Sequence, residues 1–185
     1  NVIKYASDDK MMIQTLVDQA TSTFDSVRDY YDWRRRTLLT KMYFTVTGEN
    51  CITTATPAGN IKLEVDPEWG RAYKYATGKT YEPLVLNRLY KTFSPSDIFF
   101  NIGARWGIFS IFAQRAGLNP SNIHSFEAND ENFEILRRNL SAQHILNNVY
   151  VSDIDGEKEL TLDSYISKHD SPTVMKIDIE GSELK

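Results

Sequence analysis

Two glycines four residues apart give the clearest chemical signal in this sequence. Gly103 and Gly107 lie in the stretch FFNIGARWGIFS, where an apolar, strand-like run passes into a helix-like pattern. A glycine at the end of a strand lets backbone amides approach a ligand closely, because no side chain intervenes and a positive φ costs little. The spacing is G-x-x-x-G, not the G-x-G-x-x-G of dinucleotide sites. Arg105 and Trp106 also crowd the loop, so the sequence favours a ligand without phosphates.

Glu127 is the acid that would complete such a site. It ends the next strand-like segment, 20 residues after Gly107. An acid at that place can accept hydrogen bonds from both hydroxyls of a ribose. A tight turn followed by a solvated carboxylate is the alternative that needs no ligand.

Two carboxylates follow the last strand-like segment, TVMKIDIE. In an extended chain Asp178 and Glu180 point to the same face, because residues two apart do so. Of two close carboxylates, one holds a proton more tightly, which suits a general base. The pair could bind a divalent metal, but two carboxylates without a histidine do not identify a metal site, and we assign none. One of them could instead cap the next helix, with Gly181 in the turn.

The remaining reactive side chains are isolated in the sequence. Cys51 has no histidine or second cysteine nearby, so we expect a structural role. His124, His144 and His169 fall in a strand, near a helix end and in a loop, and we expect each to be structural or solvated.

Alternating segments in the C-terminal half would position these residues. The strand-like segments are DIFFNIG, NIHSFE, NNVYVS and TVMKIDIE. The helix-like segments between them are WGIFSIFAQRAG, NDENFEILRRNLSAQH and TLDSYISKH. Such alternation predicts an α/β fold with right-handed crossovers and a parallel sheet. Asn129 or Asp130 would cap the second helix, whose inner face would be Phe133, Leu136 and Leu140.

The N-terminal half follows different patterns. Residues 9 to 40 carry an apolar stripe typical of an amphipathic helix. KMYFTVT, CITTAT and IKLEV predict a small antiparallel ribbon over residues 41–65. Pro83 then begins a helix. Its expected buried positions are Leu84, Leu86, Leu89, Tyr90 and Phe93.

We therefore divide the chain into an N-terminal helix and β-ribbon extension, 1–80, and an α/β core, 81–185.

The core resembles a known family. The segments DIFFNIGARWGIFS, IHSFEANDENFEILRRNL, SDIDGE, TLDSYI and MKIDIEGSEL come in the order found in FkbM-type methyltransferases, which use S-adenosylmethionine. The resemblance covers residues 80 to 185. It implies the Rossmann-like class I methyltransferase sheet and O-methylation of a hydroxyl on a sugar, glycolipid or secondary metabolite.

The resemblance also implies roles for single residues. Asn101, Gly103 and Ala104 would lie against the methionine part of the cofactor, Glu127 would hold the ribose, and Asp153 would lie near the adenine. The expected cofactor-binding set is Asn101, Gly103, Ala104, Gly107, Glu127, Ala128 and Asp153. The expected catalytic residues are Asp178 and Glu180.

The sequence departs from the family in two places. Asn101 stands in place of the usual aspartate. An asparagine keeps an acceptor oxygen but lacks the negative charge, so we expect weaker cofactor affinity. The stretch from Val149 to Thr161 is short, and the sequence stops at Lys185, after the fourth strand of the sheet. We therefore expect that the sheet is incomplete, and that loops and a C-terminal part are missing or a partner covers the open edge.

Composition narrows the remaining possibilities. The chain has 185 residues, is 41% hydrophobic and 25% charged, and carries a net charge of −4. This argues against a broad nucleic-acid surface. No apolar run approaches the roughly 20 residues of a membrane span, and nothing reads as a signal peptide. A single cysteine fits a reducing compartment, so we expect a cytoplasmic protein with a small-molecule or glycan acceptor, and a possible homo-oligomer through the N-terminal helix.

Two other functions stay open at this point. A nicotinamide-dependent oxidoreductase is disfavoured by the missing third glycine and by the absence of a Tyr-x-x-x-Lys signal. A catalytically weak or inactive module for cofactor binding or assembly would explain Asn101 and the early stop.

Overall fold

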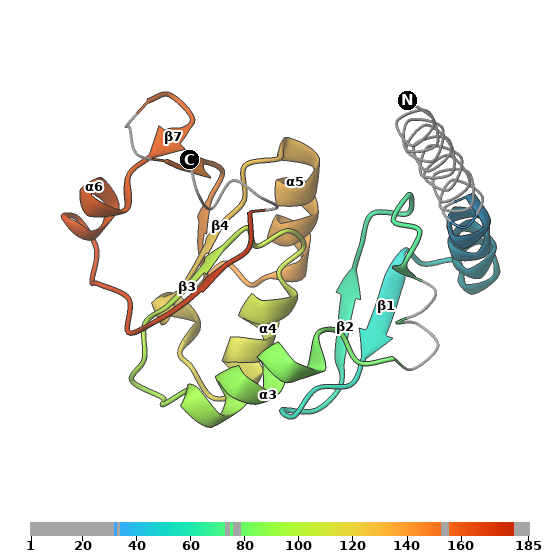
Figure 1. The fold of residues 1–185 in the computed structure, drawn as a ribbon, viewed down its shortest axis with the longest axis horizontal. Helices are drawn as coiled ribbons and strands as arrows, with labels where there is room; N and C mark the ends of the chain where they lie inside the picture. The colour runs from blue at the N-terminus through green and yellow to red at the C-terminus, as the bar shows by residue number, and fades with distance from the viewer. Residues whose placement is uncertain (1–31, 33, 73–74, 76–78, 153–155, 180–185) are drawn as a thin grey trace, which may run out of the picture.

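A computed structural model describes residues 32, 34–72, 75, 79–152 and 156–179. Its centre is a parallel sheet with the strand order β5-β4-β3-β8 (Figure 1). The strands are β3 (Phe99–Ile102), β4 (Ile123–Phe126), β5 (Ile145–Asn147) and β8 (Val174–Ile177). The predicted parallel α/β sheet is confirmed. Because the chain builds outward from β3 to β5 and then returns to the other side of β3, the strand order reverses between β3 and β8, where α/β folds bind ligands.

Helices cover the sheet on both faces (Figure 1). They are α3 (Pro83–Thr92), α4 (Ile108–Arg115), α5 (Asp130–Asn139) and α6 (Leu162–Ile166), with a short 3-10 turn over Pro120–Asn122. Phe99 packs with α4, whereas Phe100 and Phe126 pack with Tyr165 of α6 on the opposite face. All residues of β3 and β4 are buried, as expected for central strands covered on both sides. A further strand pair, β6 (Tyr150–Val151) with β7 (Glu159–Leu160), completes the described strands of this half.

The predicted helix ends are present, although not every predicted core position is buried. Pro83 lies in the first turn of α3, and the side chain of Asn129 caps α5 by accepting from the Asn132 amide. Leu86 and Leu89 are buried, but Leu84 is 85% exposed and Tyr90 also faces outward, so those two predictions were wrong. Leu84 lies outside the stripe that α3 turns toward the core, whereas Tyr90 lies at its margin, with its ring centre 6.4 Å from that of Phe112. On α5, Leu136 and Leu140 are buried as predicted.

The ribbon is shorter than the sequence predicted. It consists of β1 (Cys51–Thr54) and β2 (Ile61–Glu64), paired antiparallel with Ile52 opposite Leu63. KMYFTVT is not a strand, because residues 34–47 are helical. The physical reason is a buried stripe at helical spacing, Thr37, Thr40 and Phe44, which outweighs the strand preference of the β-branched residues. The rest of the expected N-terminal helix, 9–31 and 33, lies outside the described residues.

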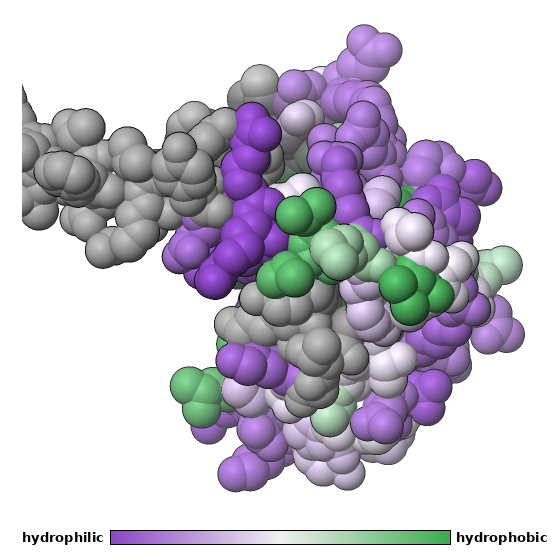
Figure 2. Space-filling view, turned by 90° about the vertical axis from the view of Figure 1, so that its right-hand side faces the viewer, coloured by the Kyte–Doolittle hydropathy of each residue, from purple (hydrophilic) through white to green (hydrophobic). Residues whose placement is uncertain are grey.

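The outer face of this helix carries apolar side chains. Leu38, Leu39, Met42 and Val46 are exposed there. Figure 2, which views the molecule from the right-hand side of Figure 1, shows hydrophobic side chains in separate patches on a mostly hydrophilic surface. The homo-oligomer through the N-terminal helix stays a prediction. Among the described residues, no helix has the length and apolar character to cross a membrane.

The ribbon docks on the core through packing and through one asparagine. Its apolar residues belong to the same hydrophobic cluster as Phe109 and Phe112 of α4. Asn139, at the end of α5, accepts from the Glu64 amide (2.8 Å) and donates to the carbonyls of Glu64 and Trp106 (2.8 Å each). These three bonds tie β2 to α5 and to the loop before α4. The ribbon is thereby fixed beside the carboxyl ends of the sheet strands.

Candidate functional site

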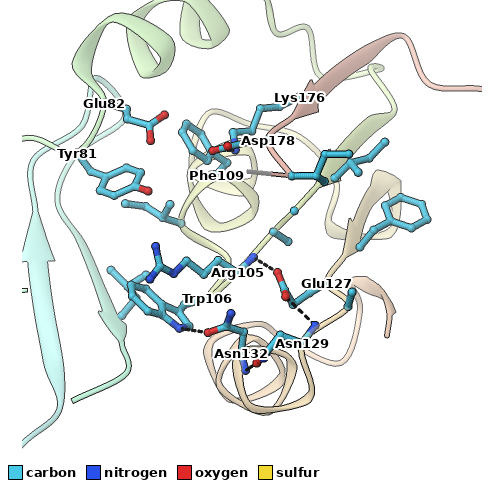
Figure 3. A pocket seen from close by; sticks show the side chains of 18 of the residues that line it. Tyr81, Glu82, Arg105, Trp106, Phe109, Glu127, Asn129, Asn132, Lys176 and Asp178 are labelled. Carbon is cyan, nitrogen blue, oxygen red and sulfur yellow. Dashed lines mark hydrogen bonds and ion pairs between the residues drawn. The ribbon is translucent and has the colours of Figure 1, made fainter. Parts of the chain in front are cut away.

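A cavity of about 530 Å³ lies at the carboxyl ends of β3, β4 and β8 (Figure 3). Its volume falls in the range of about 300–1,000 Å³ typical of small-molecule sites. One wall comes from the sheet and the loops that follow its strands. The other wall comes from the ribbon and from the segment before α3, including Trp69, Arg71, Tyr81 and Glu82. The cavity therefore joins residues from both halves of the chain.

Gly103, the residue after β3, lies against the chain that follows β8. Its φ is +73°, and a Cβ there would lie 1.9 Å from the carbonyl oxygen of Asp178. Only glycine fits this position, for both reasons. The amides of Gly103 and Ala104 both donate to the carbonyl of Phe126 (3.0 and 2.9 Å). The loop is therefore held against the end of β4, and Gly103 and Ala104 line the cavity as predicted.

Glu127 lies at the end of β4 with both carboxylate oxygens held by backbone amides. Oε2 accepts from the Arg105 amide (2.7 Å), and Oε1 accepts from the Asn129 amide (2.9 Å). Each oxygen keeps a further lone pair. The carboxylate is thus fixed in one orientation and can still accept from two neighbouring hydroxyls, which fits a ribose. Ala128 lines the cavity beside it.

Part of the cavity lining is apolar. It is formed by Phe126, Val149 and Val151, with Tyr150 at its edge. The acceptor oxygens of Glu127 and this apolar wall together suit an adenosyl group. Asp153, which the resemblance places near the adenine, lies outside the described residues.

Two of the predicted cofactor residues do not line the cavity. Asn101 is 0% exposed, and its amide donates to Ser110 Oγ (3.0 Å), which in turn is 2.7 Å from Ser125 Oγ. Its Oδ1 has no partner among the described residues. Because the side chain lies beneath α4, the missing charge cannot act on a ligand by direct contact.

Gly107 serves helix packing. It has a φ of +88° and caps α4, and a Cβ there would lie 2.7 Å from Leu136 Cδ1 of α5. The close neighbour is therefore the next helix, although Gly107 was expected among the cofactor-binding residues.

Asp178 reaches the cavity with a cation as its partner. Its carboxylate lies 3.0 Å from Lys176 Nζ. The Lys176 side chain is only 11% exposed, and Nζ lies 4.6 Å from the centre of the Phe109 ring. Glu180, the expected second carboxylate, lies outside the described residues. Sequence reasoning missed Lys176, although period-two alternation puts it on the same face as Asp178.

The segment before α3 supplies two polar groups that sequence reasoning also missed. Glu82 has a φ of 36°, which is strained for a residue other than glycine, and its carboxylate points into the cavity (Figure 3). Burial, aided by the charge of Glu82, raises the pKa of Tyr81 well above its usual range, so Tyr81 stays a neutral phenol. The amide of Tyr81 donates to Thr54 Oγ1 of β1 (3.1 Å), so the ribbon positions this residue.

The histidines lie away from this cavity. His124 is buried, with Nδ1 2.8 Å from the Tyr165 hydroxyl, and burial lowers its pKa to about 4. His169 stacks on the same tyrosine. Both line a second, polar hollow near Ile98, which precedes β3 at the opposite end of the sheet. Within the described part of the chain, no group of three or more His, Cys, Asp or Glu residues could hold a metal ion.

Comparison with known proteins adds no relative from which a role could be transferred. No family model, no curated protein and no solved structure matches this chain. The chemistry of the cavity is therefore the basis for assigning a function.

Proposed function

We propose that this chain is an S-adenosylmethionine-dependent O-methyltransferase with the Rossmann-like class I fold. The observation that carries the proposal is the Glu127 carboxylate, fixed by two backbone amides beside the positive-φ Gly103 in one cavity. A carboxylate with one free lone pair on each oxygen is suited to the two hydroxyls of a ribose. The order of sequence motifs from Asp97 to Glu183 supports the same function.

The cavity residues would divide the cofactor between them. Glu127 would accept from both ribose hydroxyls, and the apolar wall beside it would enclose the adenine. Gly103 and Ala104 would face the methionine part. When bound, the cofactor supplies a sulfonium-activated methyl group, so the protein mainly aligns the acceptor oxygen with it. Alignment of this kind can contribute as much as about 7–11 kcal/mol.

Asp178 is the group we assign to the acceptor. A hydroxyl is a weak nucleophile until its proton leaves, and Asp178 can take that proton at the edge of the cavity. Lys176 acts as a positioning residue, because its ion pair and its contact with Phe109 restrict the carboxylate. The acceptor would be a hydroxylated small molecule such as a sugar, glycolipid or secondary metabolite.

Calorimetric titration with S-adenosylmethionine, S-adenosylhomocysteine and NADH tests this function. We expect binding of the first two only, weakened at least tenfold by Glu127→Ala. The matched control is Glu131→Ala, which removes an exposed carboxylate four residues away and should leave the affinity unchanged. Binding of NADH alone, or of none of the three, would overturn the proposal. Cofactor binding without methyl transfer to any hydroxylated acceptor would favour a non-catalytic module.

A further inference from the structure

We propose that Arg105 binds a carboxylate of a molecule that occupies the cavity, in a recess between the ribbon and the sheet. This inference deepens the proposed function and rests on it for the kind of ligand. The carboxylate has two possible sources, the amino-acid part of the cofactor and an acidic acceptor such as a uronate. Three features of Arg105 carry the argument: its position over two tryptophan rings, its lack of a carboxylate partner among the described residues, and its backbone conformation.

Two tryptophans hold the guanidinium in place. Its Cζ lies 4.0 Å from the centre of the Trp106 ring and 5.3 Å from that of Trp69. The two rings meet edge to face at 4.6 Å, and Trp106 Nε1 donates to Asn132 Oδ1 (2.8 Å). Stacking uses the flat face of a guanidinium and leaves the N–H groups in its plane free to donate. Arg105 is therefore presented as a fixed donor along the cavity wall.

The described residues provide no carboxylate partner for this cation. Lys176 and Arg138 each have a carboxylate oxygen within 3.0 Å, whereas no ion pair among the described residues includes Arg105. Glu127 accepts from its backbone amide, not from its side chain. In Figure 3 the Glu82 carboxylate lies beyond the Tyr81 ring and does not point at the guanidinium. Arg105 is partly buried and its cation has only the two tryptophan rings as partners among the described residues, so an anionic ligand would add the charge-assisted hydrogen bonds that its N–H groups lack.

The backbone at Arg105 is in an unfavourable conformation for an arginine. Its φ is 50°, in the left-handed region that glycine and asparagine adopt more readily. Strain of this kind is unfavourable and concentrates at functional sites. Here it lets the Arg105 amide reach Glu127 while the side chain turns toward Trp69. One residue thus connects the ribose-binding acid to the ribbon wall.

The charges around the cavity indicate where an anion would bind. Arg71 lines the cavity together with Arg105. Lys176, the remaining cation of the described lining, is already paired with Asp178, and the Glu82 carboxylate would repel an anion from its side. A guanidinium offers two parallel N–H donors, which match the two oxygens of a carboxylate. The recess beside the tryptophans is therefore suited to a carboxylate, and the Asp178 side to a neutral hydroxyl.

Arg105→Gln tests the inference, with Arg115→Gln, an exposed arginine at the end of α4, as the matched control. The probes are S-adenosylhomocysteine, 5′-methylthioadenosine, which lacks the amino-acid carboxylate, and glucuronate added with and without S-adenosylhomocysteine. If the cofactor supplies the carboxylate, Arg105→Gln weakens S-adenosylhomocysteine at least tenfold and leaves 5′-methylthioadenosine unchanged. If the acceptor supplies it, Arg105→Gln abolishes only glucuronate binding.

The outcomes separate this inference from the proposed function. Equal affinities of wild type and Arg105→Gln for all three probes, with equal thermal stability, would overturn the role of Arg105. An equal loss in Arg115→Gln would overturn it as well. If the wild type binds neither adenosyl probe, the methyltransferase proposal fails, and glucuronate titration alone tests the role of Arg105. Glucuronate binding that Arg105→Gln abolishes would support the carboxylate site. No binding of glucuronate would overturn it.

Discussion

Replacing Gly103 with alanine should force apart the loop after β3 and the chain after β8. The new Cβ would lie 1.9 Å from the carbonyl oxygen of Asp178, a distance that Cβ contacts do not reach, so one backbone has to move by more than 1 Å. That movement breaks the bond from the Asp178 amide to the Ile102 carbonyl (3.1 Å). A left-handed alanine costs about 1–2 kcal/mol, and the lost hydrogen bond about 0.5–1.5 kcal/mol. We expect the free energy of unfolding to fall by about 1.5–3.5 kcal/mol.

Gly117→Ala is the matched control for this substitution. Gly117 also has a positive φ, +107°, but a Cβ there would meet nothing within 4 Å. Its replacement should cost only the backbone term, about 1–2 kcal/mol. Urea denaturation of both variants measures the difference, and S-adenosylhomocysteine titration of Gly103→Ala should show weakened binding. Equal losses of stability in the two variants would refute the close approach of Gly103 to Asp178.

Three further changes test other parts of the account. Asn139→Ala leaves the backbone groups of Glu64 without partners, so it should lower the free energy of unfolding by about 2–4 kcal/mol. The control Glu64→Gln weakens only an exposed ion pair and should cost less than about 1 kcal/mol. Equal losses of stability in urea would contradict the docking of the ribbon through Asn139. Asp178→Asn should bind cofactor normally but transfer methyl groups about 10²–10⁴-fold more slowly, and an unchanged rate would exclude Asp178 as the base. Because burial lowers the pKa of His124 to about 4 while the unfolded chain keeps about 6.5, the unfolded state takes up the proton first. The free energy of unfolding should therefore fall by up to about 3 kcal/mol between pH 6.5 and pH 4, and His124→Gln should remove this part of the slope; an unaltered slope would contradict it.

Local patterns predicted the sheet and its helices, except for the third strand. The sheet uses β5 (Ile145–Asn147), whereas Tyr150–Val151 of the predicted strand NNVYVS pairs with β7 outside the sheet. Alternating strand and helix segments gave the parallel sheet, and Pro83 and Asn129 marked the helix starts found in the structure. The same local reasoning failed over residues 41–47, where composition favours a strand. The helical conformation of residues 41–47 is favoured because Phe44 is buried at helical spacing from Thr40 and Thr37. That burial depends on the residues against which the helix packs, which the local sequence does not indicate.

The site was predictable only where it lies on the sheet. Gly103 and Glu127 follow strands and line the cavity as expected. Only the family resemblance placed Asn101 against the cofactor; in the structure its side chain is buried under α4, where its amide donates to Ser110 Oγ. The opposite wall, with Tyr81 and Glu82, comes from a segment with no periodicity, so only tertiary contacts bring it to the cavity.

Hydrogen–deuterium exchange with and without S-adenosylhomocysteine tests the central claim most directly, because it locates the ligand on the chain. The account predicts slower exchange of the amides over residues 103–107 and 127–132, which surround the Glu127 carboxylate, with no change in α6. Unchanged exchange in both segments, or protection confined to the His124 end of the sheet, would contradict the proposed cofactor site.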